Sequence, residues 1–104
     1  MRISFRGLKL KKERKWSGTW WIVLADIPVE FRSQINLFRK KIKSLGMRTL
    51  QRSVWIYPYD PSDEIAFLAK YYGLERFITT IEVKTLEAED EQNFKHHFKK
   101  IAVL

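Results

Sequence analysis

A run of six apolar residues, Trp20–Ala25, restricts most narrowly how this chain can fold. It has the length of a single β-strand, and a membrane span would need about 20 apolar residues. Because neighbouring side chains of a strand point to opposite faces, a strand that is apolar at every position must be covered on both faces. Asp26-Ile27-Pro28 follows, and proline ends strand pairing. The run therefore predicts a central strand of a sheet.

The next segment has the pattern of an amphipathic helix. Apolar residues recur at steps of four and three, which is the spacing of one helix face. The members of this stripe are Phe31, Ile35, Phe38, Ile42 and Leu45. Gly46 follows as the glycine that ends a helix. Residues 31–45 are therefore predicted to be helical, with their basic side chains mostly on the outer face.

Two short strands are predicted at residues 47–51 and 53–57, with Arg52 at a tight turn or bulge between them. Asp60 is predicted to cap a second helix that starts with Pro61 and ends before Gly73. Asp63 and Glu64 then occupy the positive first turn of that helix. Residues 77–83 alternate as a fourth strand.

The last segment, residues 87–104, begins with acids and ends with bases, as a helix dipole favours. This terminal helix is expected either on its own sheet or across a partner subunit. Four strands and two helices in the order βαββαβ predict an α+β fold, the ferredoxin-like sandwich, with both helices on one sheet face. The sequence thus divides into a basic arm or linker, 1–15, and the domain itself, 16–104. The opposite sheet face, with few residues left to cover it, predicts a homodimer formed through that face or an edge strand.

Positive charge is concentrated in the first part of the chain. Residues 1–60 contain 14 Lys and Arg against 4 Asp and Glu, whereas residues 61–104 contain 6 against 8. This asymmetry predicts a DNA or RNA backbone beside the first half. A merely solvated surface, or an acidic protein or lipid surface, remains the alternative. The candidate phosphate-binding residues are Arg14, Lys15, Arg32, Arg39, Lys40, Lys43, Arg48 and Arg52.

Several classes of protein are excluded or disfavoured. The chain has no cysteine, so disulfides and thiolate zinc sites are excluded and a reducing, cytoplasmic location is expected. No apolar stretch is long enough for a membrane span or a signal peptide. There is no glycine-rich phosphate loop and no nucleophile elbow, and no organic cofactor is expected. His96 and His97 are adjacent on a helix, point about 100° apart, and are interpreted as surface residues.

Asp26 is the one acid with a candidate catalytic position, at the end of the central strand. A single carboxylate binds Mg²⁺ poorly, because this ion takes an octahedron of oxygen ligands. A two-fold dimer could bring two Asp26 side chains to one Mg²⁺ shared between subunits, which would activate water against a phosphodiester. The alternative is a turn or N-cap residue. Whether the protein is a metal-dependent endonuclease is therefore left open.

Two further groups have alternative interpretations. The polar break between the two short strands consists of Gln51, Arg52 and Ser53. These side chains either hold the hairpin in place or donate hydrogen bonds to a nucleic-acid backbone. Aromatic residues cluster on the strands, where they form core or interface more often than they stack on bases. They are Trp16, Trp20, Trp21, Trp55, Tyr57 and Tyr59.

Over roughly residues 16–84 the sequence resembles the central domain of the phenylacetate-degradation repressors, the PaaX-like regulators. The matching stretches are Trp-Ser-Gly-Thr-Trp (16–20), Asp-Ile-Pro (26–28), Arg-Lys-Lys-Ile-Lys-Ser-Leu-Gly (39–46), Leu-Gln-Arg-Ser-Val-Trp-Ile (50–56) and Pro-Tyr-Asp (58–60), with Glu64 and Ile65. That domain is in turn similar to the CRISPR-associated small endonuclease, the dimeric spacer-adaptation subunit. In the endonuclease family an aspartate ends the first strand, which Asp26 matches. A Gln-x-Ser-Val-aromatic hairpin follows, which Gln51, Ser53, Val54 and Trp55 match.

The resemblance implies a ferredoxin-like homodimer. For the endonuclease branch it further implies an Mg²⁺-dependent nuclease that uses Asp26 of both subunits and works with a CRISPR integrase subunit. The Pro-Tyr-Asp stretch, including Asp60, is typical of the repressor branch, yet the winged helix expected before residue 16 there is absent from this sequence. Two functions are therefore expected: a dimeric nucleic-acid-binding protein of the CRISPR adaptation type, or a non-enzymatic dimerisation domain of a PaaX-type repressor.

Overall fold

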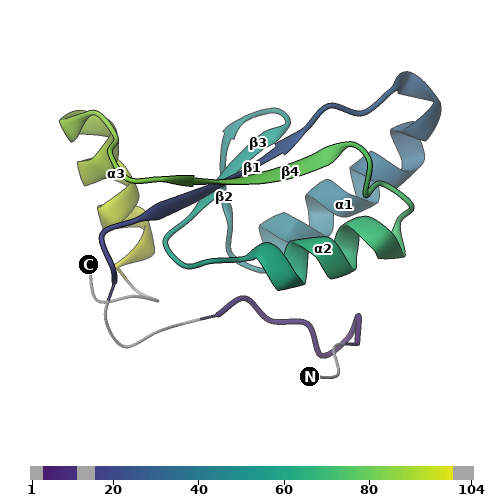
Figure 1. The fold of residues 1–104 in the computed structure, drawn as a ribbon, viewed down its shortest axis with the longest axis horizontal. Coiled ribbons are helices and arrows are strands. Elements are labelled where there is room, and N and C mark those ends of the chain that lie inside the picture. Colours follow the sequence, from purple (N-terminus) through teal and green to yellow (C-terminus); the bar gives the residue numbers. More distant parts are fainter. Residues whose placement is uncertain (1–3, 12–15, 100–104) are drawn as a thin grey trace.

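In a computed structural model that describes residues 4–11 and 16–99, the chain folds around a four-stranded antiparallel sheet (Figure 1). The strands are β1 (Trp20–Ala25), β2 (Arg48–Gln51), β3 (Val54–Tyr57) and β4 (Ile78–Val83), in the sheet order β2-β3-β1-β4. The helices are the short 3-10 helix η1 (Val29–Phe31), α1 (Arg32–Ser44), α2 (Ser62–Tyr71) and α3 (Ala88–Phe98). Since β3 lies between β1 and β2, this is the predicted ferredoxin-like α+β arrangement, which the structure confirms.

The apolar strand β1 is central, as predicted, and pairs with β3 on one side and β4 on the other. Val23 is opposite Trp55 of β3 and points to the face that α1 covers, where the Trp55 and Phe38 rings lie 5.7 Å apart, edge to face. Val23, Phe38 and Trp55 are all buried. Helix α2 lies beside α1 on the same face (Figure 1). The predicted helix end at Gly46 is present too, with a positive φ of 108° that glycine adopts without strain.

On the opposite face of the sheet, α3 is the described element that covers the surface, and it does so at one end. Phe94 and Phe98 of α3 pack on the Trp20 ring, each with a centroid distance of 6.0 Å, and the Trp20 indole N–H donates a hydrogen bond to Glu91. Further along this face Ile22 and Leu24 of β1 are half-buried, and Ile81 of β4 is 41% exposed. We call Ile22, Leu24, Val54 and Ile81 the open face.

Residues 4–11 pack against the domain instead of extending away from it. Leu8 and Leu10 are buried in the core, and the Phe5 ring stacks on Tyr71 of α2 at 4.5 Å. The Tyr57 hydroxyl donates a hydrogen bond to the Lys11 carbonyl oxygen. The sequence predicted an arm or linker here, and the alternation of its apolar residues left room for a short strand. The described part of the segment is irregular and strand-free, with its leucines turned inward. The division at residue 15 stays a prediction.

The start of α2 places one acid on the surface and another in the interior. Helix α2 begins at Ser62 with Pro61 at the N-cap, so the prediction of Asp60 as the cap is wrong by one residue. Asp60 still accepts a hydrogen bond from the Ser62 backbone N–H at 2.9 Å, just before the helix. Asp63 is exposed and lies 3.8 Å from the Lys11 ammonium. Glu64 is 3% exposed, and within the described residues its Oε1 atom has no hydrogen-bond partner. Its burial raises the pKa of this carboxyl above the ordinary glutamate value, an effect that the nearby Lys11 charge opposes.

Among the described residues, no helix combines the length and hydropathy of a membrane span. The cytoplasmic location stays a prediction.

Candidate nucleic-acid interface

Asp26 lies directly after β1, at one end of the sheet, and its side chain is exposed. Its backbone N–H donates to the carbonyl oxygen of Phe77 at 3.0 Å, and Ala25 N–H donates to the carbonyl oxygen of Ser53 at 2.9 Å. These two bonds hold the chain around Asp26 between β3 and β4. They leave the Asp26 carboxylate at the surface, beside the turn that joins β2 and β3.

That turn is joined to α1 through Arg39. The Arg39 guanidinium donates to the Ser53 hydroxyl at 2.9 Å and to the Asn36 side-chain oxygen at 3.2 Å. Burial, and secondarily the charge of Arg52, lowers the pKa of Arg39 from the usual arginine value. The described contacts of Arg39 therefore link the helix to the hairpin, and its predicted contact with phosphate stays a prediction. The Ser53 hydroxyl accepts the hydrogen bond from Arg39, and this contact holds the hairpin against α1. Holding the hairpin in place was one of the two roles expected for Ser53.

The other predicted phosphate contacts are distributed along α1 and β2. Arg32, Lys40 and Lys43 are exposed on α1, and Arg48 and Arg52 are exposed at the two ends of β2. Within residues 4–11 and 16–99, the ion pair that forms joins Lys11 and Asp63. None of these five cations is therefore in an ion pair with a described residue. Gln51, the last residue of β2, is exposed beside Arg52. Arg14 and Lys15 lie outside the described residues.

The structure brings only some of the predicted site residues together. Arg39 is bonded to Ser53 and lies near Arg52, whereas Asp26 is at the same end of the sheet because it follows Ala25, whose N–H donates to Ser53. Arg48 lies at the opposite end of β2, where its guanidinium is 3.0 Å from the His97 ring of α3. We call the exposed basic residues of α1 and of the edge strand β2 with its following turn the basic flank: Arg32, Lys40, Lys43, Arg48 and Arg52.

The residues of one chain do not fit a resident Mg²⁺ ion at Asp26. No group of three or more His, Asp or Glu side chains that could hold a metal exists within the described ranges. The neighbouring carbonyl oxygens of Ser53 and Phe77 already accept backbone hydrogen bonds. Asp26 alone therefore offers one carboxylate, fewer protein ligands than a stable magnesium site ordinarily needs.

The strand aromatics are used mainly inside the protein. Trp20, Trp55, Tyr57 and Tyr59 are buried in the core, so their faces are not available to bases. The Trp16 ring packs on Trp20 at 4.8 Å and is half-buried. Desolvation in this core raises the pKa of the Tyr57 hydroxyl to about 12, with further contributions from Tyr59 and Glu64.

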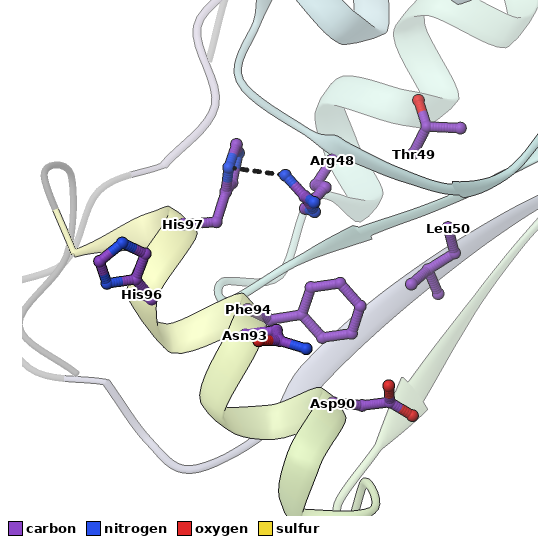
Figure 2. Close-up of a pocket in the computed structure, with 8 residues that line it drawn as sticks. All are labelled: Arg48, Thr49, Leu50, Asp90, Asn93, Phe94, His96 and His97. Carbon is purple, nitrogen blue, oxygen red and sulfur yellow. Dashed lines mark hydrogen bonds between the residues drawn. The ribbon is translucent and has the colours of Figure 1, made fainter.

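Sequence reasoning missed a cleft between β2 and α3, in which Arg48 and Leu50 face Asp90, Phe94 and His97 (Figure 2). His97 was interpreted as an ordinary surface residue because no sequence pattern pairs it with Arg48, 49 positions away. The spacing of Asp90, Phe94 and His97 on one helix face was the available signal, and it could be seen only once the helix was known to pack beside β2.

The fold and this flank define a ferredoxin-like domain with a basic surface and an exposed aspartate at the end of its first strand. The family model of the PaaX protein central Cas2-like domain matches residues 13–95. The chain therefore belongs to the PaaX central Cas2-like domain family. Among curated proteins, none matches this chain.

Proposed function

We propose that this chain works as the dimeric, nucleic-acid-binding domain of a PaaX-type transcriptional regulator and binds polynucleotide through the basic flank without cutting it. The observation that carries the proposal is the set of exposed cations on α1 and β2 that lack ion-pair partners in the described part of the chain. Cations left unpaired along one surface attract a polyanion, since each phosphate contact releases a condensed counterion. The family membership supports the regulatory assignment.

The open face supports the dimer in this proposal. Ile22, Leu24, Val54 and Ile81 lie on the sheet face that α1 and α2 do not cover, and α3 shields only the end near Trp20. A second copy that places its own open face there would bury these apolar side chains symmetrically. Such a dimer would carry two basic flanks, which gives a polynucleotide a longer surface than one chain offers.

We predict that binding to double-stranded DNA weakens steeply with salt and depends on the flank. About four phosphate contacts would lower the affinity roughly 100-fold between about 50 and 200 mM salt. The double variant Lys40→Gln and Arg52→Gln should reduce the slope of log affinity against log salt by about 2 per chain, since each lost phosphate contact reduces it by about 1. Fluorescence anisotropy with a labelled duplex at several salt concentrations measures both quantities.

The matched control is Lys70→Gln with Lys84→Gln, which removes the same net charge from exposed positions on α2 and after β4. It should keep the slope of the native protein. An equal loss in both double variants would show that net charge, and not the basic flank, is responsible. Binding that does not respond to salt would contradict the proposal altogether.

A second candidate function, Mg²⁺-dependent phosphodiester hydrolysis of the CRISPR adaptation type, is favoured by one observation, the exposed Asp26 at the end of β1. It requires Asp26 of a second subunit, because the described residues of one chain include no group of three or more His, Asp or Glu side chains that could hold a metal. An integrase subunit would then be a further partner.

For this second function the expected result is that no cleavage exceeds that of the Asp26→Asn variant when labelled DNA and RNA are incubated with the protein and Mg²⁺. Gel analysis of the products decides the question. Cleavage by the native chain that Asp26→Asn abolishes, with unchanged binding and unchanged dimerisation, would establish the nuclease and overturn the non-cutting part of the proposal.

A further inference from the structure

The cleft between β2 and α3 has the size and the chemistry of a small-ligand site. Its volume is about 480 Å³, within the range of roughly 300–1,000 Å³ that small-molecule sites occupy. A neighbouring hollow of about 520 Å³ shares Arg48, Thr49 and His97 with it and adds Lys43 at the end of α1. The two hollows meet at Arg48, which is therefore reachable from both.

One end of the cleft is positive. The Arg48 guanidinium lies 3.0 Å from Nδ1 of His97 (Figure 2). Because an arginine N–H can only donate, Nδ1 accepts this bond, and the neutral ring carries its proton on Nε2. Arg48 is exposed and has no carboxylate partner within the described ranges. Its remaining N–H groups can bind a phosphate in the bidentate manner that guanidinium favours.

The rest of the cleft suits an organic ring that carries a hydrogen-bond donor. Leu50 and Phe94 contribute apolar surface to the lining, and Phe94 is 8% exposed. Asp90, one helical turn before Phe94, presents a carboxylate at the end of the cleft away from His97, as Figure 2 shows. An ionised carboxylate only accepts hydrogen bonds, so it selects a ligand with an amino group.

We propose that this cleft binds a phosphorylated nucleoside, with its phosphate on Arg48, its base against Leu50 and Phe94, and an amino group of the base on Asp90. Cytosine fits this arrangement, because its exocyclic amine is a donor that acidic side chains accept. The ligand comes either as a free mononucleotide or as the 5′-phosphorylated end of a strand. The cleft shares Arg48 with the basic flank, and the neighbouring hollow shares Lys43, but Lys40 and Arg52 line neither, so a variant of those two residues tests DNA binding without altering the cleft.

Ligand binding should be linked to proton uptake by His97. Burial, then the charges of Arg48 and His96, lowers the pKa of His97 below the ordinary histidine value. The charged or titratable groups around it are Arg48 from β2, His96 and Asp90 from α3, and Lys43 from α1. A phosphate dianion at Arg48 favours the imidazolium form, so affinity should rise as the pH falls from 8 to about 6.5, above the second phosphate pKa of about 6.

The test is calorimetric titration of the whole chain with cytidine 5′-monophosphate, cytidine and uridine 5′-monophosphate. Removing the phosphate or substituting Arg48→Gln should weaken binding about 10- to 100-fold, the usual cost of losing a charge-assisted hydrogen bond. The preference for the cytidine over the uridine nucleotide should disappear in Asp90→Asn. His97→Asn should abolish the proton uptake, seen as heats that no longer vary with the ionisation enthalpy of the buffer.

Lys84→Gln is the charge-matched control, and its affinity should equal that of the native chain. Equal binding of cytidine and its monophosphate, no loss in Arg48→Gln, or the same loss in Lys84→Gln would each overturn the proposal. Unchanged melting temperatures of Arg48→Gln and His97→Asn verify that the variants are folded. Since both side chains are exposed, at least one of these variants should meet this condition.

Short strands that begin with cytidine and carry either a 5′-phosphate or a 5′-hydroxyl distinguish the two sources. If the 5′-phosphate raises the affinity for the strand and Arg48→Gln removes this increase, the ligand is a strand end. If the mononucleotide binds and the 5′-phosphate does not raise the affinity for the strand, the ligand is the free nucleotide. Loss of duplex binding in Lys40→Gln with Arg52→Gln, with intact mononucleotide binding, would show that the cleft works even where the basic flank fails.

Discussion

Replacing Ile81 with lysine should convert the proposed dimer to a monomer while leaving the fold intact. Ile81 lies on the edge strand β4 of the open face, opposite Ile22 of β1, and is 41% exposed in a single chain. An ammonium group placed without an opposite charge in a self-paired apolar interface costs several kcal/mol. Dimerisation should therefore weaken at least about 100-fold, equivalent to roughly 2.7 kcal/mol.

Sedimentation velocity over a range of protein concentrations measures this change. Leu37→Lys is the matched control, because Leu37 is a similarly exposed apolar residue, 51% exposed, on α1. It should leave the dimer unchanged. A dimer that persists in Ile81→Lys but is lost in Leu37→Lys would place the interface on the helical side. If the native chain stays monomeric at tens of micromolar, the dimeric part of the proposed function is wrong.

Replacing Glu64 with glutamine should stabilise the protein at neutral pH. Glu64 is buried in the first turn of α2, and its Oε1 atom lacks a hydrogen-bond partner among the described residues. Burying an unsatisfied polar group costs about 1–3 kcal/mol, and more for a charged one. The neutral amide avoids the charge, so the free energy of unfolding at pH 7.5 should rise by about 1–2 kcal/mol.

The direction of the Glu64 pKa shift determines at which pH the variant is more stable than the native chain. Burial raises the pKa of Glu64 in the folded state, so the folded protein holds this proton more tightly than the unfolded chain. The stability that Glu64 contributes is complete below its unfolded pKa, about 4.3, and is lost as the pH rises through the folded value. The advantage of Glu64→Gln should accordingly be present at pH 7.5 and vanish near pH 4.

Urea unfolding at pH 4 and 7.5 measures both values. Asp63→Asn is the adjacent control, since its exposed carboxylate forms a surface pair with Lys11, and such pairs contribute only about 0–1 kcal/mol. If the Glu64→Gln variant is less stable than the native chain at pH 7.5, the prediction is contradicted. That result would show that the ionised Glu64 carboxylate has hydrogen-bond partners in solution.

Much of the fold could be predicted because it depends on short-range patterns. The observed strand Trp20–Ala25 coincides with the apolar run, and α1 occupies residues 32–44 where the stripe predicted 31–45. The ferredoxin-like order followed from the succession of these elements. The strand pairings and the family membership agree with it. By contrast, α2 begins one residue later than predicted and α3 begins at Ala88 instead of Glu87, as helix ends commonly shift. Helix α3 ends at Phe98, and most of its predicted continuation to residue 104 lies outside the described residues.

The candidate site was predicted less completely, because its contacts join distant parts of the chain. The hydrogen bonds of Arg39 to Asn36 and Ser53 were not foreseen, because Ser53 is 14 positions away on the hairpin. Glu64 was expected only as an acid in a helix first turn, a pattern that does not reveal which side of the helix faces the core. His97 gained a partner only because α3 packs beside β2.

Local order along this chain was determined by the sequence itself. Alternating or helical spacing of apolar residues selects strand or helix wherever one face must leave water, and the glycine after α1 and the proline after β1 end those elements. Tertiary structure alone decided which polar groups meet. The Arg48–His97 contact, the Arg39 bridge and the buried Glu64 all depend on how α1, α2 and α3 are placed against the sheet, and no pattern within one element contains that information.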